Sequence, residues 1–182
     1  MTLGTGRILR SAARSIYTSL MGSAKENQML EAGARAPDFR LDVLDGGGQK
    51  SLPDLLSSGS VLLAFFKVSC PTCQLTLPFL ERIHRGKAPV VAVSQDDAEA
   101  TREFQKEFGI TMPTLLDSAR VGYPASNAYG LAYVPSLFLV ERDGKISWSQ
   151  TGFNRKQIEA IGRKFGVEVF QAGDSVPESK SG

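Results

Sequence analysis

The sequence predicts an α/β domain with a central mixed β-sheet flanked by helices on both faces. Two continuous apolar runs, residues 60–67 and 89–95, are typical of parallel strands that are buried on both faces. A helical pattern follows each run. Near the end of the chain, "SLFLV" and "KISWS" are joined by "ERDG", which indicates an antiparallel hairpin. Parallel strands therefore come first, and a hairpin closes the sheet.

The first elements are a short hairpin and a strand with its helix. "GARAPDFRL" (33–41) and "QKSL" (49–52) flank a "DGGG" turn, and together they predict a leading β-hairpin. "SVLLAFFK" (60–67) predicts the first buried strand. A helix is expected to follow over residues 70–84.

The middle of the chain repeats this alternation. "PVVAVSQ" (89–95) predicts the second buried strand, and Asp97 is a good N-cap for the helix "AEATREFQKEF". Gly109 is expected to end that helix. A weaker third strand is expected in residues 111–118 and a short helix in residues 123–130.

The last element after the closing hairpin is a helix. Asn154 and Gln157 are spaced as in a capping box, and they predict where this helix starts. Its apolar residues recur at helical spacing and are expected to be buried; they are Ile158, Ile161 and Phe165.

Length and composition suit one domain with a tail at each end. We divide the chain into an N-terminal segment (1–32), an α/β domain (33–170) and a tail (171–182). The tail, "QAGDSVPESKSG", has little apolar content and is expected to be disordered. The formal net charge of +2 does not favour nucleic acid as a partner. No apolar run approaches the ~20 residues that span a membrane.

The N-terminal segment is basic and amphipathic. Four basic residues precede its first acid, Glu26; they are Arg7, Arg10, Arg14 and Lys25. Arginines interrupt the apolar centre that a secretory signal needs, so a transit peptide or a membrane-surface helix over residues 7–21 fits better. A helix docked on the domain and a loose tail are the alternatives. We expect a cytoplasmic protein unless this segment directs it to an organelle or a membrane surface.

Both cysteines of the chain lie in one short stretch, "KVSCPTCQLTLP" (67–78). Cys70 and Cys73 are too close in sequence to constrain a secreted scaffold as a disulfide. A closed zinc site needs four ligands, and the chain has a single histidine, His84. No metal or other cofactor is therefore expected. Three interpretations are open for the pair: a redox centre, two inert buried thiols, or half of a zinc site shared by two chains.

The position of the pair, where a strand ends and a helix begins, favours the redox interpretation. If Cys70 is the N-cap, Pro71 takes the first helical position, where its missing N–H costs nothing, and Cys73 takes the third. Unpaired N–H groups and the helix dipole then stabilise a thiolate at the N-cap. Cysteines at this spacing lie ~5–6 Å apart on one helix face, within reach of a disulfide. One thiol can attack a foreign disulfide, and the other can release the product.

Over residues 33–170, the chain resembles the thioredoxin superfamily. It is most similar to the redoxin and TlpA/ResA-like branch, which has a leading β-hairpin and an inserted βα unit; residues 89–118 correspond to that insertion. The resemblance implies a thioredoxin-like fold and an oxidoreductase with a Cys-Pro-Thr-Cys motif, whose two inner residues are Pro71 and Thr72. It also implies that Cys70 is the nucleophile and Cys73 the resolving thiol.

Three further positions match the superfamily. Pro78 lies where these proteins kink the active-site helix. Val134 and Pro135, in "YVPSLFLV", match the cis-proline loop that faces the cysteines. The resemblance implies that these two residues bind an extended substrate segment as an added strand. Gly152 lies after the closing hairpin, where the family commonly has a glycine.

The chain also departs from the family pattern. Ser69 replaces the usual aromatic residue before the first cysteine, and the dipeptide between the thiols is Pro-Thr rather than Gly-Pro. Ala64 and Thr76 stand where family members carry a carboxylate that assists the second thiol. Lys67 is the one charged side chain between Ala64 and the motif; it can favour a thiolate by charge, but as an ammonium it cannot accept a proton.

Three functions are open at this point. The first is a thiol-disulfide oxidoreductase in cell redox homeostasis, which acts on protein or small-molecule disulfides and is reduced again by an unidentified electron donor. The second is a peroxiredoxin-like (AhpC/TSA) thiol peroxidase with antioxidant activity, although the Pro-x-x-x-Thr-x-x-Cys signature of that family is absent. The third is a copper carrier of the thioredoxin fold. Such carriers space their cysteines by three residues and need a nearby histidine, whereas His84 lies at the far end of the predicted helix.

Overall fold

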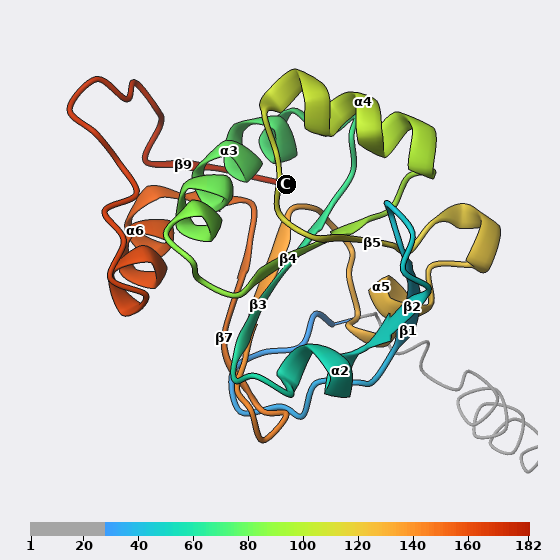
Figure 1. Cartoon of the computed structure of the whole chain (residues 1–182). Coiled ribbons are helices and arrows are strands. Elements are labelled where there is room, and N and C mark those ends of the chain that lie inside the picture. The colour runs from blue at the N-terminus through green and yellow to red at the C-terminus, as the bar shows by residue number, and fades with distance from the viewer. Residues whose placement is uncertain (1–27) are drawn as a thin grey trace, which may run out of the picture.

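The computed structural model describes residues 28–182. These residues form a fold built around one seven-stranded sheet (Figure 1). The sheet has the strand order β2-β1-β5-β4-β3-β6-β7. Expectations for residues 1–27 lie outside the described residues. The strands are β1 (Arg40–Val43), β2 (Gln49–Ser51), β3 (Val61–Phe66), β4 (Val90–Ser94), β5 (Thr114–Leu116), β6 (Ser136–Val140) and β7 (Ile146–Thr151).

Strand directions confirm the mixed sheet that the sequence predicts. β3, β4 and β5 are parallel to one another, while β6 and β7 form the closing antiparallel hairpin. β1 and β2 form the leading hairpin, and β1 joins the sheet antiparallel to β5. All residues of β3 are buried, as the continuous apolar run predicts for a strand covered on both faces.

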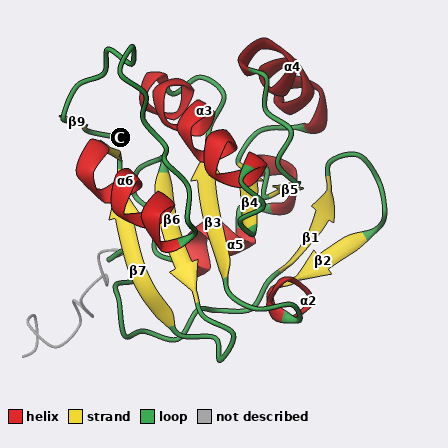
Figure 2. Cartoon of the chain, turned by 60° about the vertical axis from the view of Figure 1, so that its left-hand side comes forward, coloured by secondary structure: helices red, strands yellow, loops and turns green. Residues whose placement is uncertain are grey.

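Two layers of helices cover the sheet (Figure 2). Leu62, Ala64 and Phe66 of β3 face a core that includes α3, α4 and α6, and the alternate residues of β3 face α2 and α5. The helices are α2 (Leu52–Leu56), α3 (Pro71–Arg85), α4 (Ala98–Phe108), α5 (Pro124–Ala128) and α6 (Arg155–Lys164), with a short 3₁₀ turn at Ala119–Val121.

The capping residues identified in the sequence start and end the helices as expected. Asp97 accepts a hydrogen bond from Ala100 N at 2.9 Å, and Asn154 accepts one from Gln157 N at 3.1 Å. Gly109 ends α4 with a left-handed φ of 64°. These local signals therefore fix both ends of α4 and the start of α6, two helices on the same side of the sheet.

One helix, α2, differs from the prediction that residues 49–52 form a strand. β2 ends at Ser51, which caps α2 instead, and Leu52 is the first helical residue. Asp54 accepts a hydrogen bond from Ser51 N at 2.8 Å, and Ser51 Oγ accepts one from Asp54 N at 3.3 Å. This reciprocal capping box, together with the proline that follows Leu52, favours a helix over a longer strand.

The folded domain begins at least five residues before the expected boundary at residue 33. Leu30 N donates a hydrogen bond to Tyr129 O at 3.1 Å. Met29 and Leu30 pack against the apolar cluster on the α2 and α5 side of the sheet. Residues 28–32 therefore belong to the domain rather than to the N-terminal segment.

We expect residues 28–32 to stabilise the domain. A chain that starts at residue 28 keeps the contacts of Met29 and Leu30, whereas a chain that starts at residue 33 loses them. The shorter chain should lose about 1–3 kcal/mol of unfolding free energy, because it loses partly buried apolar area and hydrogen bonds such as that of Leu30 N to Tyr129 O. Urea denaturation of the two chains measures this difference. Identical unfolding free energies would show that these contacts contribute nothing.

The C-terminal segment contradicts the expected disordered tail over residues 171–182. β9 (Ser179–Lys180) pairs antiparallel with β8 (Phe153–Asn154), and Val176 packs against the core. Asp174 accepts two hydrogen bonds from Arg82, the longer at 3.0 Å, and these bonds lower the pKa of Asp174 to about 2. The ordering comes mainly from backbone pairing and one ion pair, neither of which leaves an apolar pattern in the sequence, and Val176 is a single apolar contact. Within residues 28–182, none of the helices is long and apolar enough to cross a membrane.

Candidate active site

Cys70 lies where the sequence predicts it, between the end of β3 and the start of α3. Its backbone is extended (φ −85°, ψ 114°), and its Sγ accepts a hydrogen bond from Cys73 N at 3.2 Å. Pro71 occupies the first turn of α3, where its missing N–H has no partner to lose. The sulfur of Cys70 therefore takes the place of an N-cap oxygen, at the positive end of the helix dipole.

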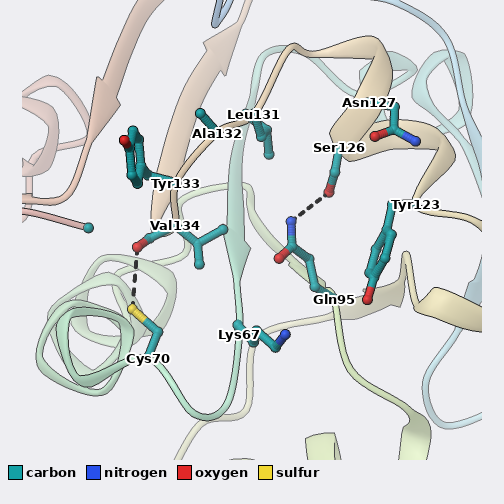
Figure 3. A pocket seen from close by; sticks show the side chains of 11 residues that line it. Lys67, Cys70, Gln95, Tyr123, Ser126, Asn127, Leu131, Ala132, Tyr133 and Val134 are labelled. Atoms are coloured by element: carbon teal, nitrogen blue, oxygen red, sulfur yellow. Dashed lines mark hydrogen bonds between the residues drawn. The ribbon is translucent and has the colours of Figure 1, made fainter. Parts of the chain in front are cut away.

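The cis-proline loop faces this sulfur, as Figure 3 shows. The Cys70 thiol donates a hydrogen bond to Val134 O at 3.3 Å, across a sequence separation of 64 residues. The Val134–Pro135 peptide bond is cis, as the pattern predicts. Gly152, which has a left-handed φ of 73°, donates its N–H to Pro135 O at 2.8 Å. The fold thus brings the motif, the cis-proline loop and Gly152 together.

The two thiols differ sharply in access to solvent. Cys70 is partly exposed, whereas Cys73 is fully buried on the core-facing side of α3, in the same apolar cluster as Ala64 and Leu77. Burial raises the pKa of Cys73 well above its usual range, although a hydrogen bond from the Lys67 backbone opposes this effect. Both cysteines are free thiols in this structure.

The supporting residues of the motif have distinct surroundings. Thr72 is buried, and its hydroxyl donates a hydrogen bond to Ser181 O at 2.6 Å. Thr76 is also buried and donates to Thr72 O at 2.7 Å. Pro78 lies inside α3, which continues past it to Arg85. The Lys67 side chain is exposed beside Cys70, so its charge lies at the surface of the site, whereas its backbone contacts the buried thiol.

A cavity of about 510 Å³ opens beside Cys70 and Val134 (Figure 3). Gln95 and Ser126 form part of its wall, and Gln95 Nε2 donates a hydrogen bond to Ser126 Oγ at 2.9 Å. Tyr133, on the cis-proline loop, is 65% exposed. A ligand that enters this cavity meets the Cys70 sulfur and the Val134 carbonyl at the same time.

Asp96 is a site residue that sequence reasoning missed. Its Oδ2 accepts a hydrogen bond from Val68 N at 2.7 Å, so it holds the turn that leads into the motif. Its negative charge also contributes to the raised pKa of Cys73. A signal was present, because Asp96 and Val68 follow two adjacent parallel strands, whose carboxyl ends meet at one edge of a sheet.

A family model and a number of known proteins resemble this chain. The family model described as Redoxin matches residues 31–163. The thiol-disulfide oxidoreductase ResA of Geobacillus thermodenitrificans is 28% identical over 146 residues, which cover 78% of this chain and 81% of that protein. ResA of Bacillus thuringiensis is 25% identical over 154 residues, which cover 81% of this chain and 86% of that protein.

A solved structure agrees with these sequence relatives. The thioredoxin domain of a thiol-disulfide oxidoreductase from Bacteroides vulgatus has a TM-score of 0.65 at 22% identity, over 75% of this chain and 98% of that one. This likeness shows the thioredoxin-like fold. The Redoxin match spans both cysteines and Pro135. The chain therefore belongs to the Redoxin family of the thioredoxin superfamily, and it is a thioredoxin-like oxidoreductase.

Proposed function

We propose that this chain is a thiol-disulfide oxidoreductase that reduces protein disulfides, with Cys70 as the attacking thiol and Cys73 as the resolving thiol. The observation that carries the proposal is the unequal access of the two sulfurs: Cys70 lies at the cavity, and Cys73 is buried one helical turn away. A substrate disulfide can therefore approach Cys70, while Cys73 is placed to react with Cys70 alone.

Two contacts support Cys70 in the attacking role. The Cys73 N–H at 3.2 Å and the N-terminal end of α3 both favour negative charge on the Cys70 sulfur. On its other side, Val134 O at 3.3 Å marks the backbone along which an extended substrate segment can lie as an added strand. The same sulfur thus lies at the positive end of α3 and against the backbone that a substrate segment would pair with.

In the first step, the Cys70 thiolate attacks one sulfur of the substrate disulfide. A Cys70–substrate disulfide forms, the original S–S bond breaks, and the other substrate sulfur leaves as a thiolate that takes up a proton. In the second step, Cys73 loses its proton, and its thiolate attacks the Cys70 sulfur. The Cys70–Cys73 disulfide forms, and the second substrate sulfur leaves and is protonated. Two electrons pass to the substrate, so an upstream electron donor must supply two electrons to reduce the Cys70–Cys73 disulfide again.

Insulin reduction tests this proposal. In the presence of dithiothreitol, the full chain is expected to accelerate precipitation of the insulin B chain well beyond the rate with dithiothreitol alone. Hydrogen peroxide consumption, measured with the same thiol supply, is expected to stay at the rate of dithiothreitol alone. A chain that consumes peroxide rapidly and leaves insulin intact would favour the peroxidase function instead.

A further inference from the structure

The last five described residues, 178–182, cross the surface beside the candidate active site, and Figure 1 shows this end of the chain passing α3. Glu178 O accepts a hydrogen bond from Arg155 N at 2.9 Å, and β9 then pairs with β8. Ser181 O accepts the hydroxyl of Thr72 at 2.6 Å. The segment therefore contacts Thr72, one of the two residues that lie between the cysteines.

Gly182 continues this path onto the cis-proline loop. It lines the same cavity as Cys70 and Val134. A Cβ added to Gly182 would lie 2.5 Å from Val134 O, so its backbone is packed directly against that carbonyl. Val134 O also accepts the hydrogen bond that the Cys70 thiol donates. The segment thus ends on the backbone that we propose as the substrate-pairing edge.

Because Gly152 has no side chain, there is room beside it for the C-terminal segment. A Cβ added to Gly152 would lie 2.5 Å from Lys180 O and 3.1 Å from Gly182 N. Gly152 also holds Pro135 through its N–H. β8, Gly152, Val134 and Thr72 therefore form one continuous strip, which we call the docking strip, and residues 178–182 lie along it.

We propose, building on the thiol-disulfide exchange function above, that residues 178–182 occupy in cis the strip that an extended segment of a protein substrate uses, so that protein disulfides must displace them. A substrate segment that pairs with Val134 needs the space of Gly182. Segment and substrate therefore compete for one surface, and the C-terminal segment slows exchange with polypeptides.

The contacts that hold residues 178–182 are weak enough for a substrate to displace the segment. The side chains of residues 178–182 are all exposed, so the segment is held mainly through its backbone. Each net hydrogen bond of this kind shifts an equilibrium by only about two- to twelvefold. The ion pair between Arg82 and Asp174 holds the preceding loop, so a displaced segment stays close and returns readily.

Truncation gives the test. The full chain is compared with a chain that ends at Glu178, which lacks β9, Ser181 and Gly182. We measure the rates at which the reduced proteins react with insulin and with 5,5′-dithiobis(2-nitrobenzoate), a small disulfide that needs no extended pairing. Truncation is expected to raise the insulin rate about tenfold, as one or two lost hydrogen bonds allow, and to change the small-disulfide rate less than about twofold.

The outcomes separate this inference from the proposed function. An insulin rate that is unchanged or lower after truncation, with normal reaction of the small disulfide, overturns the inference alone. The segment would then not compete with protein substrates, or would help to bind them. A full chain that reacts with neither disulfide overturns the proposed function, and the inference with it.

A peptide added in trans gives a second measurement. A synthetic peptide with the sequence of residues 174–182 is expected to slow the reaction of the truncated chain with insulin, whereas a scrambled peptide of the same composition is not. Equal effects of the two peptides contradict specific occupancy. If the truncated chain does not fold, Gly182→Leu in the full chain replaces it, because the new side chain would collide with Val134 O. This variant should raise the insulin rate severalfold, and an unchanged rate contradicts the proposal.

Discussion

Replacing Cys70 with serine is expected to reduce insulin reduction to the rate without protein, while replacing Cys73 with serine is expected to trap the substrate. A serine hydroxyl at position 70 is not ionised at neutral pH and cannot form a mixed disulfide. In Cys73→Ser, attack by Cys70 survives, but the thiol that releases the substrate is missing. Intact-mass measurement after mixing with insulin should therefore show a covalent adduct in Cys73→Ser and none in Cys70→Ser.

Alkylation rates check this assignment without any substitution. In the reduced chain, iodoacetamide is expected to label Cys70 well before Cys73, since Cys70 is partly exposed and Cys73 is buried. Peptide mapping after partial labelling identifies the modified thiol. Preferential labelling of Cys73 would reverse the assigned roles of the two thiols. Equal adducts in the two serine variants would show that the roles are not distinct.

Resolution of the mixed disulfide, rather than the first attack, is expected to limit turnover at neutral pH. Burial raises the pKa of Cys73, so its neutral thiol predominates until the pH approaches that raised value. Below the pKa, the thiolate fraction grows about tenfold for each pH unit, and the resolution rate should follow it upward. Single-turnover release of substrate from the preformed mixed disulfide, measured between about pH 6 and pH 9, gives this rate directly.

Ala64→Asp is expected to accelerate resolution at neutral pH by about tenfold or more, because a carboxylate in the apolar cluster of Cys73 can accept its proton. The change should also cost about 1–3 kcal/mol of stability, since Ala64 is fully buried. Ala64→Asn is the matched control, with nearly the same shape but no basic group. It should lose similar stability and gain no rate.

A flat pH profile that is unchanged in Ala64→Asp would show that the proton goes elsewhere. Asp96 is then the residue to replace next, because its charge acts on Cys73. If Asp96 accepts the proton of Cys73, Asp96→Asn should slow resolution. If Asp96 only raises the pKa of Cys73 through its charge, as we expect, Asp96→Asn should make the Cys73 thiolate easier to form and speed resolution.

The parts of the fold that the sequence predicts correctly are those with local signals. β3 is apolar throughout, and Asp97, Gly109 and Asn154 sit at helix ends whose backbone groups they satisfy. Cys70 belongs to the same class, because its role as an N-cap depends on the next three residues. Its contact with Val134 is long-range, and the family resemblance, not local chemistry, predicted that pairing.

Most errors arise where long-range contacts decide the structure, and one arises from a local capping signal. Residues 49–52 look like a strand, but the reciprocal bonds of Ser51 and Asp54 start a helix there. The segment 171–182 has little apolar content, yet β9 and the ion pair of Asp174 order it. Asp96 was assigned no role, because its partner Val68 lies 28 residues away in the sequence. The contacts of β9, Asp174 and Asp96 depend on how the chain assembles, whereas Ser51 and Asp54 are only three residues apart.

The path of the C-terminal end has a practical consequence for handling the protein. An affinity tag, fluorescent protein or surface linker fused after Gly182 would begin next to Val134 and Cys70, at the mouth of the cavity. Such a fusion would add bulk where a partner protein must approach, and a histidine tag would bring metal-binding side chains to the nucleophile. Protein for exchange assays should therefore carry its tag at the N-terminal end, attached through a cleavable linker.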